Sequence, residues 1–173
     1  MEAGLATTSA INQQPWFFVV LTNEDTMTEI SASMSFGRPA GAPPAGAAPA
    51  GNVPAAPPAG ASAAKAGFGD SPAAILIYMN TDTPSPNPNF DCGLACQSMV
   101  VAANALGYGT KIISSPTMAL NGENHDALCE KLGVDPALQA VAVLLLGNVD
   151  TDIDGATGSS VRSPLMEKVS FIQ

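Results

Sequence analysis

Side chains that could hold a small molecule gather in the loop Ser9-Ala10-Ile11-Asn12-Gln13-Gln14-Pro15-Trp16, which runs directly into the apolar stretch 16–21. Hydroxyl and amide groups at the mouth of a buried element commonly hold ligands in place. Asn12 carries both a donor and an acceptor, which suits the edge of a heterocycle. A loop asparagine also commonly bonds to its local backbone, so the residues alone leave both roles open. Trp16, at the start of the strand, is expected to pack in the core rather than to stack on a ligand.

Three cysteines and one histidine are the other reactive groups. Cys92 and Cys96 share one face of a predicted helix at i and i+4, whereas His125 and Cys129 lie elsewhere in the sequence. Because no second paired motif completes a metal-binding pattern, buried reduced thiols are favoured and no metal is expected. His125 is expected to face solvent, and Asp91 to cap a helix rather than to act as an acid.

The charge balance excludes some partners. The chain carries a formal net charge of -9 and only six Lys and Arg residues, which argues against a nucleic-acid binder. Arg162 follows an acidic loop, and both a phosphate contact and a surface ion pair remain open for it. No apolar run reaches the roughly 20 residues needed to cross a bilayer, and the amino terminus is not that of a secretory signal. We therefore expect no membrane partner and a cytoplasmic location.

Short apolar runs alternate with helical patterns along the chain. Strands are predicted at 16–21, 73–79, 110–113 and 138–146, and helices at 1–6, 22–34, 91–106 and 124–132. There are too few strand-helix-strand repeats for a doubly wound sheet, so an α+β fold with helices around a mixed sheet is expected. The most apolar run, 138–146, is the expected middle strand. Segment 168–172 has strand propensity but no obvious neighbour within its own chain.

One segment has a composition of its own. Between Gly37 and Gly67 every residue is Ala, Pro or Gly, apart from Arg38, Asn52, Val53, Ser62 and Lys65. Such a composition offers little to bury, and its prolines interrupt both helices and strands. We predict a disordered or polyproline-like insert at about 37–71, which interrupts a single domain spanning residues 1–173.

Taken together, these motifs resemble the FMN-dependent nitroreductase family. Ser9 to Trp16 is similar to that family's Pro-Ser-x-x-Asn-x-Gln-Pro-Trp loop, with Thr8 at the position of the usual proline. The other matching stretches are Asp91 to Gln97 with Leu106 to Thr110, Leu144 to Gly147, and Arg162-Ser163-Pro164. They resemble the family's central helix with its Leu-Gly-Leu-Gly-Thr turn, its final core strand and its Arg-x-Pro segment, and they occur in the family's order.

The resemblance implies a nitroreductase-like homodimer with two flavins at the interface and a C-terminal segment exchanged between the subunits. It places FMN contacts on residues of one loop, one turn and the C-terminal part: Thr8, Ser9, Ala10 and Asn12, then Ile113, Ser114 and Ser115, then Ser160 and Arg162. A backbone amide of the turn would face flavin N5, and the last two residues would approach the phosphate. Loop and turn would come from different protomers.

The resemblance also implies a flavin oxidoreductase. NADH or NADPH would donate a hydride, and a flat small-molecule acceptor such as a nitroaromatic or a quinone would be reduced in ping-pong order. Since the flavin carries the chemistry, no catalytic side chain is expected.

Two departures from the family are visible. The Arg-x-Ser-x-Arg phosphate clamp has no counterpart, because the chain starts inside the helix that follows it, and the insert replaces helices that line the active site. The chain is therefore expected to be an amino-terminally truncated member, and a degenerate, non-catalytic dimer with weak FMN binding is the alternative.

Overall fold

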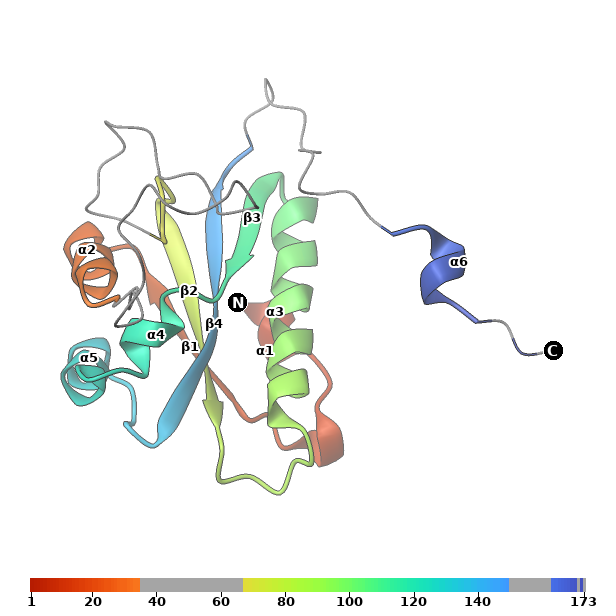
Figure 1. Cartoon of the computed structure of the whole chain (residues 1–173), viewed down its shortest axis with the longest axis horizontal. Helices are drawn as coiled ribbons and strands as arrows, with labels where there is room; N and C mark the ends of the chain where they lie inside the picture. Colours follow the sequence, from red (N-terminus) through yellow and green to blue (C-terminus); the bar gives the residue numbers. More distant parts are fainter. Residues whose placement is uncertain (35–66, 150–162, 171, 173) are drawn as a thin grey trace, which may run out of the picture.

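A four-stranded sheet lies between two layers of helices (Figure 1). The computed structural model describes residues 1–34, 67–149, 163–170 and 172. The strands are β1 (Trp16–Leu21), β2 (Ala73–Asn80), β3 (Tyr108–Ile113) and β4 (Leu138–Asn148). Helices α1 (Glu2–Leu5) and α3 (Pro88–Ala105) cover one face, and α2 (Glu24–Ala32), α4 (Thr117–Leu120) and α5 (His125–Leu132) cover the other. The predicted α+β class is confirmed, although the short helix α4 was not predicted.

The strand order in the sheet is β1-β2-β4-β3, and all three pairings are antiparallel. The expected mixed sheet is therefore not what the described residues form. The physical reason is the position of β4, which lies between β2 and β3. The strands β2 and β3 run parallel and are joined through α3, but they are not neighbours, so the crossover produces no parallel pair. The predicted central place of 138–146 is confirmed, since it falls within β4.

The apolar run of β2 fills both faces of the sheet. Ile75, Ile77 and Met79 pack against α3, while alternate residues on the opposite face pack against α2, α4 and α5. This follows from the period-two alternation of side chains along a strand, and it explains the absence of polar positions in the run. Helix α1 lies close against α3 because Gly4 has no side chain. A Cβ at Gly4 would come within 2.9 Å of Met99 Cγ.

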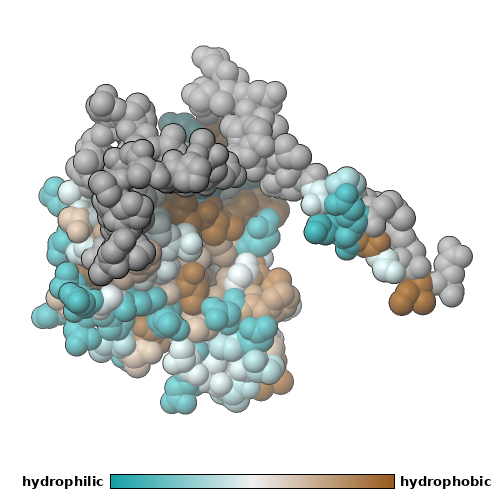
Figure 2. Space-filling view, viewed as in Figure 1, coloured by the Kyte–Doolittle hydropathy of each residue, from teal (hydrophilic) through white to brown (hydrophobic). Residues whose placement is uncertain are grey.

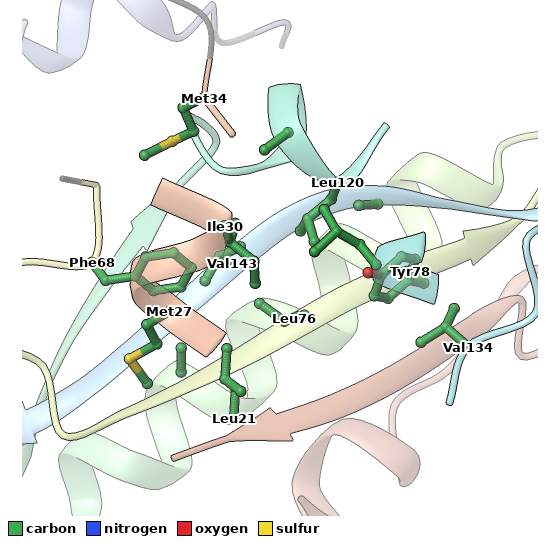
Figure 3. Packing of buried hydrophobic residues seen from close by; sticks show 14 of the residues in the cluster. Leu21, Met27, Ile30, Met34, Phe68, Leu76, Tyr78, Leu120, Val134 and Val143 are labelled. Carbon is green, nitrogen blue, oxygen red and sulfur yellow. The ribbon is translucent and has the colours of Figure 1, made fainter. Parts of the chain in front are cut away.

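The layer formed by α2, α4 and α5 holds the larger of the two hydrophobic clusters (Figure 3). Phe68 has no exposed surface and packs with Met27 and Ile30. It lies within the segment 37–71 for which no packing was predicted, so that boundary is wrong: residues 67–71 belong to the folded part. The Ala, Pro and Gly residues before Phe68 dominate the composition of the segment and conceal its one large apolar side chain that packs in the core. Tyr78 is also fully buried here, and its hydroxyl has no hydrogen-bond partner among the residues that the structure describes.

Asparagine side chains start two of the helices. Asn23 accepts a hydrogen bond from Thr26 N–H at 2.8 Å and caps α2. Asn87 accepts from Phe90 N–H at 3.2 Å and caps α3, whose first residue is Pro88. The prediction that Asp91 caps this helix is therefore wrong, because the helix begins one turn earlier. Asp91 lies inside α3 and is buried.

The described C-terminal residues, 163–170 and 172, include no strand. Helix α6 (Leu165–Lys168) lies away from the sheet and its two helical layers (Figure 1). Val169 and Ile172 are exposed and pair with no strand, so a strand at 168–172 does not form among the described residues. In the described ranges, none of the helices has both the length and the apolar character needed to span a bilayer.

His125 is a structural link rather than the solvent-facing residue that was expected. Its Nδ1 lies 2.6 Å from the carbonyl oxygen of Leu120, and its Nε2 lies 2.9 Å from that of Pro136. A neutral imidazole has only one donor, so two carbonyl partners favour the protonated ring. These two carbonyl groups raise the pKa of His125, against a smaller opposing effect of its burial. The ring thereby connects the end of α4 with the loop that precedes β4.

We predict that this link weakens with rising pH. The pKa of His125 is higher in the folded than in the unfolded chain, so its contribution is fully present below the unfolded value of about 6.5 and is lost as the pH rises through the higher folded value. Urea unfolding from pH 6 to pH 9 should show a larger loss of unfolding free energy in the wild type than in His125→Gln. Parallel pH profiles for the two proteins would contradict this role.

Candidate functional site

The loop that precedes β1 has an unusual backbone. It contains a short 3-10 turn (Ala10–Asn12), and three of its residues have positive φ: Ile11 at 46°, Asn12 at 55° and Gln14 at 46°. For a β-branched residue such as Ile11 this conformation is strained. Strained conformations persist where the surrounding structure fixes them, and they are frequent at ligand-binding sites. The backbone thus gives the predicted ligand loop a feature that the sequence pattern did not indicate.

Hydrogen bonds inside the loop hold part of this conformation. Ser9 Oγ accepts from Gln14 N–H at 2.9 Å, and Asn12 Oδ1 accepts from the Gln14 side-chain amide at 3.1 Å. The Asn12 side chain is exposed, and its own amide donors bond to no other group in the described part of the chain. Asn12 therefore supports the loop through its oxygen and keeps its NH₂ group available. Thr8, directly before the loop, is also exposed.

A buried carboxylate joins this loop to α3. Asp91 is 3% exposed, and its Oδ1 accepts a hydrogen bond from Ala10 N–H at 3.1 Å. Its Oδ2 accepts from the Ser85 hydroxyl at 2.7 Å. Sequence reasoning missed this contact, because no local pattern connects residues 81 positions apart. One consequence is that Ala10 N–H is already engaged and is not available to a ligand.

The second predicted contact region follows β3. Ile113 ends the strand and is half-buried, Ser114 is exposed, and Ser115 leads into the buried Pro116 and helix α4. The Ser114 carbonyl accepts from Thr117 N–H at 3.0 Å and from the Thr117 hydroxyl at 2.7 Å. Among the described residues, the backbone N–H groups of Ser114 and Ser115 donate to no other group. The turn therefore has fixed carbonyls and two available amide donors.

The loop and the turn lie at opposite edges of the sheet. The loop precedes edge strand β1 and the turn follows edge strand β3, with β2 and β4 between them. Three interstrand spacings amount to about 14 Å. Within one chain the structure therefore does not bring the two groups of predicted contact residues together. Ser160 and Arg162 lie outside the described residues.

A hollow of about 270 Å³ opens beside the loop, lined in part by Gln13, Gln14, Trp16 and Asn80. Trp16 is 9% exposed and stacks on Phe18 with ring centroids 6.3 Å apart. Its predicted role in core packing is confirmed. The described residues that line the hollow include amide side chains, two aromatic residues and the carboxylate of Asp82, and none of them is cationic. The hollow therefore offers hydrogen bonds to a ligand but no positive charge.

The cysteines do not form a shared site. Cys92 and Cys96 lie on the α3 side of the sheet, and Cys129 lies on the opposite side near His125. Burial raises the pKa of Cys92 to about 12, with a smaller contribution from the Asp91 charge. Burial also raises the pKa of Cys96 to about 11. Within the ranges that the structure describes, no three His, Cys, Asp or Glu side chains are grouped to hold a metal ion.

The sheet, its two helical layers and the polar loop are those of a class of flavin oxidoreductases. The sequence profile of the Nitroreductase family matches residues 1–148, and the chain belongs to this family. The predicted resemblance is thus confirmed over most of the chain. The chain has no match among curated protein sequences.

Solved structures show the same fold. An FMN-bound nitroreductase from Desulfitobacterium hafniense DCB-2 has a TM-score of 0.70 and 19% identity, with 99% of this chain and 83% of that chain covered. An FMN-bound nitroreductase from Bacteroides fragilis NCTC 9343 has a TM-score of 0.70, 14% identity and the same coverage. A Parabacteroides distasonis protein that carries the name NADH dehydrogenase/NAD(P)H nitroreductase has a TM-score of 0.55 and 16% identity, with coverages of 94% and 80%.

We predict that the native thiols are unreactive. Cys92, Cys96 and Cys129 are each no more than 3% exposed, and burial raises the pKa of each thiol, so little thiolate is present at pH 8. A colorimetric disulfide reagent should modify the folded protein slowly and detect three thiols in denaturant. Rapid modification of the native protein would contradict this packing.

Proposed function

We propose that a homodimer of this chain binds FMN and catalyses the reduction of small flat acceptors by NADH or NADPH. The observation that carries the proposal is the strained loop with the exposed Asn12 amide, in a chain that belongs to the nitroreductase family. The chemistry that FMN supplies when bound is hydride transfer from the nicotinamide to an acceptor such as a nitroaromatic or a quinone, in ping-pong order. The names of the similar structures, which mention bound FMN and NAD(P)H, support both the cofactor and the donor.

The described residues fit a flavin ring. The Asn12 amide could donate to a carbonyl of the ring, and the neighbouring residues Thr8 and Ser9 would offer hydroxyl groups. At the turn, the available N–H groups of Ser114 and Ser115 suit an acceptor such as flavin N5. Ala10 would contribute only by packing, because its N–H is bonded to Asp91 and its carbonyl to Gln13 N–H. Ile113 would likewise contribute through the strand end that it fixes.

Two copies of the chain are needed for this arrangement. A loop at one edge of the sheet and a turn at the other edge cannot contact the same ring from one protomer. A second protomer supplies the missing half and makes the flavin site an intersubunit site. The homodimer and the exchange of the C-terminal segment are both part of this proposal. The position of α6, outside the folded body, fits such an exchange (Figure 1).

An apolar surface is available for dimer formation. A groove of about 460 Å³ runs between α1 and α3, lined by Leu94, Val101 and Ala105 among others. Val101 is 60% exposed and Leu106 is 75% exposed. Figure 2 shows hydrophobic surface near α3 and β3 on the face displayed. Contiguous exposed apolar patches commonly mark surfaces that bind another protein.

A second candidate is a degenerate dimer that binds FMN weakly and has no catalytic role. The shortage of cations near the described loop favours it. Within the described ranges the cationic side chains are Lys111 on edge strand β3, Lys131 on α5 and Lys168 on α6, and Lys131 forms an ion pair with Glu29. The phosphate contact therefore depends on Ser160 and Arg162, which stay predictions. In both cases we propose that the chain is one domain with an internal insert. We also propose that the protein is located in the cytoplasm, where reduced cysteines are usual.

The experiment that separates these two candidates is cofactor retention followed by turnover. Purified protein supplemented with FMN and then desalted should keep a visible flavin absorbance band. It should lose that band on anaerobic addition of NADH or NADPH and recover it when a quinone or nitroaromatic is added. A protein without a retained band, or with a band that neither nicotinamide bleaches, would refute the enzyme proposal and support the degenerate dimer.

We also predict that removing the Asn12 amide weakens flavin binding. Asn12→Gly is the suitable change, because glycine accepts the left-handed backbone at φ 55° while the side-chain donor is lost. The dissociation constant for FMN, measured by fluorescence quenching, should rise about threefold to tenfold, as expected for one neutral hydrogen bond. Asn89→Ala, at an exposed position on α3, is the matched control. An equal effect of the two substitutions would return Asn12 to a purely structural role.

A further inference from the structure

The buried carboxylate of Asp91 has a role that helix capping does not explain. Asn87 already caps α3, and Asp91 points instead to the loop before β1 and to Ser85. An unpaired carboxylate is costly to bury. Here both oxygens accept hydrogen bonds, and the N-terminal turns of an 18-residue helix favour negative charge. The charge is thus kept in the interior at a position from which it reaches Ala10.

Ala10 is the first residue of the 3-10 turn, so its amide position sets the orientation of the residues that follow. Most hydrogen bonds of the loop join its own residues to one another, including those from Gln14 to Ser9 and to Asn12. In the described part of the chain, Asp91 is the side chain from outside the loop that bonds to it. The end of the loop is tied to the sheet, because the Pro15 carbonyl accepts a hydrogen bond from Asn80 N–H at 2.7 Å. Internal bonds can maintain the 3-10 turn, but they cannot fix its position relative to α3.

We propose that Asp91 is the positioning residue of the loop before β1. Its carboxylate holds Ala10, so that the following residues with positive φ present Asn12 to the flavin ring. Asp91 itself does not touch the cofactor. This inference rests on the proposed function and deepens it. It assigns the binding geometry of the loop to a bond between two segments that are far apart in the sequence, rather than to the loop alone.

Two substitutions at Asp91 separate this role from a general effect on stability. Asp91→Leu is close in size and removes both acceptors, leaving Ala10 N–H without a partner. Asp91→Asn keeps an oxygen that can accept from Ala10, and its NH₂ group can donate to Ser85, whose hydroxyl can also act as an acceptor. Ser85→Ala is the matched control, because it removes the other bond of the same carboxylate without changing the loop.

The measurements are the FMN dissociation constant, the visible circular dichroism of the bound flavin, and the melting temperature without FMN. Asp91→Leu should raise the dissociation constant about 10-fold to 100-fold, as expected for a hydrogen bond to a charged group, and should change the flavin dichroism. Asp91→Asn should leave the dissociation constant and the flavin dichroism near their wild-type values. Ser85→Ala should lower the melting temperature while leaving the dissociation constant within about threefold, since its bond lies outside the loop.

A second variant covers the case in which Asp91→Leu does not fold. Ala10→Pro removes the same hydrogen bond from the donor side. Ser9 has an extended backbone, with φ -136° and ψ 158°, which is compatible with a following proline. If the bond positions the loop, Ala10→Pro should weaken FMN binding in the wild type and equally in Asp91→Asn, which keeps an acceptor for Ala10 N–H. It should have a much smaller effect in Asp91→Leu, which has no such acceptor.

The outcomes distinguish this inference from the function on which it rests. A wild-type protein that retains no FMN refutes the proposed function, and the positioning role with it. A wild type that binds FMN, combined with an Asp91→Leu variant of unchanged affinity and dichroism, refutes the positioning role alone. Additive effects of Ala10→Pro and Asp91→Leu on FMN binding would also overturn it, whatever their effects on the melting temperature.

Discussion

The insertion of β4 between β2 and β3 constrains most of the remaining structure. This strand pairs with β2 along one side and with β3 along the other, and its central residues are fully buried. Because β4 occupies the middle, the crossover from β2 through α3 must pass over it to reach β3. Helix α3 therefore lies across the sheet, and the two edge positions are left to β1 and β3. Each proposed flavin-contact region adjoins one of these two edge strands.

Strands that are buried on both faces carry no polar groups for chemistry, so polar function is displaced to the ends of the elements. In this chain the loop before β1 and the turn after β3 take that role. Their geometry is fixed by different means. The turn is fixed by the Ser114 carbonyl, which accepts hydrogen bonds from the N–H and the hydroxyl of Thr117, whereas the loop depends on its own amides and on Asp91. A hydrogen bond to a buried charge is stronger than one between neutral groups, which suits a strained backbone.

Local chemistry predicted much of this structure. The apolar run at 73–79 predicted a strand, and it forms β2, which is buried on both faces of the sheet. The misses had non-local causes. The antiparallel character of every pairing depends on where β4 inserts, which no single segment encodes. Phe68 lies beside a segment of uniform composition, and its burial becomes visible only once α2 and the sheet are assembled. His125 is tied to Leu120 and Pro136 by two carbonyl contacts that no spacing rule predicts.

The close contact between Met34 and Gly67 has a consequence for how this chain can change. A Cβ at Gly67 would come within 2.9 Å of Met34 Cε, so the described residues on either side of 35–66 lie next to each other. Residues 35–66 therefore do not have to bridge a long distance between two fixed points. The cost of closing such a loop grows only slowly with its length. Insertions and deletions in this stretch can therefore accumulate with little effect on the sheet, and its length is free to vary among descendants of the same fold.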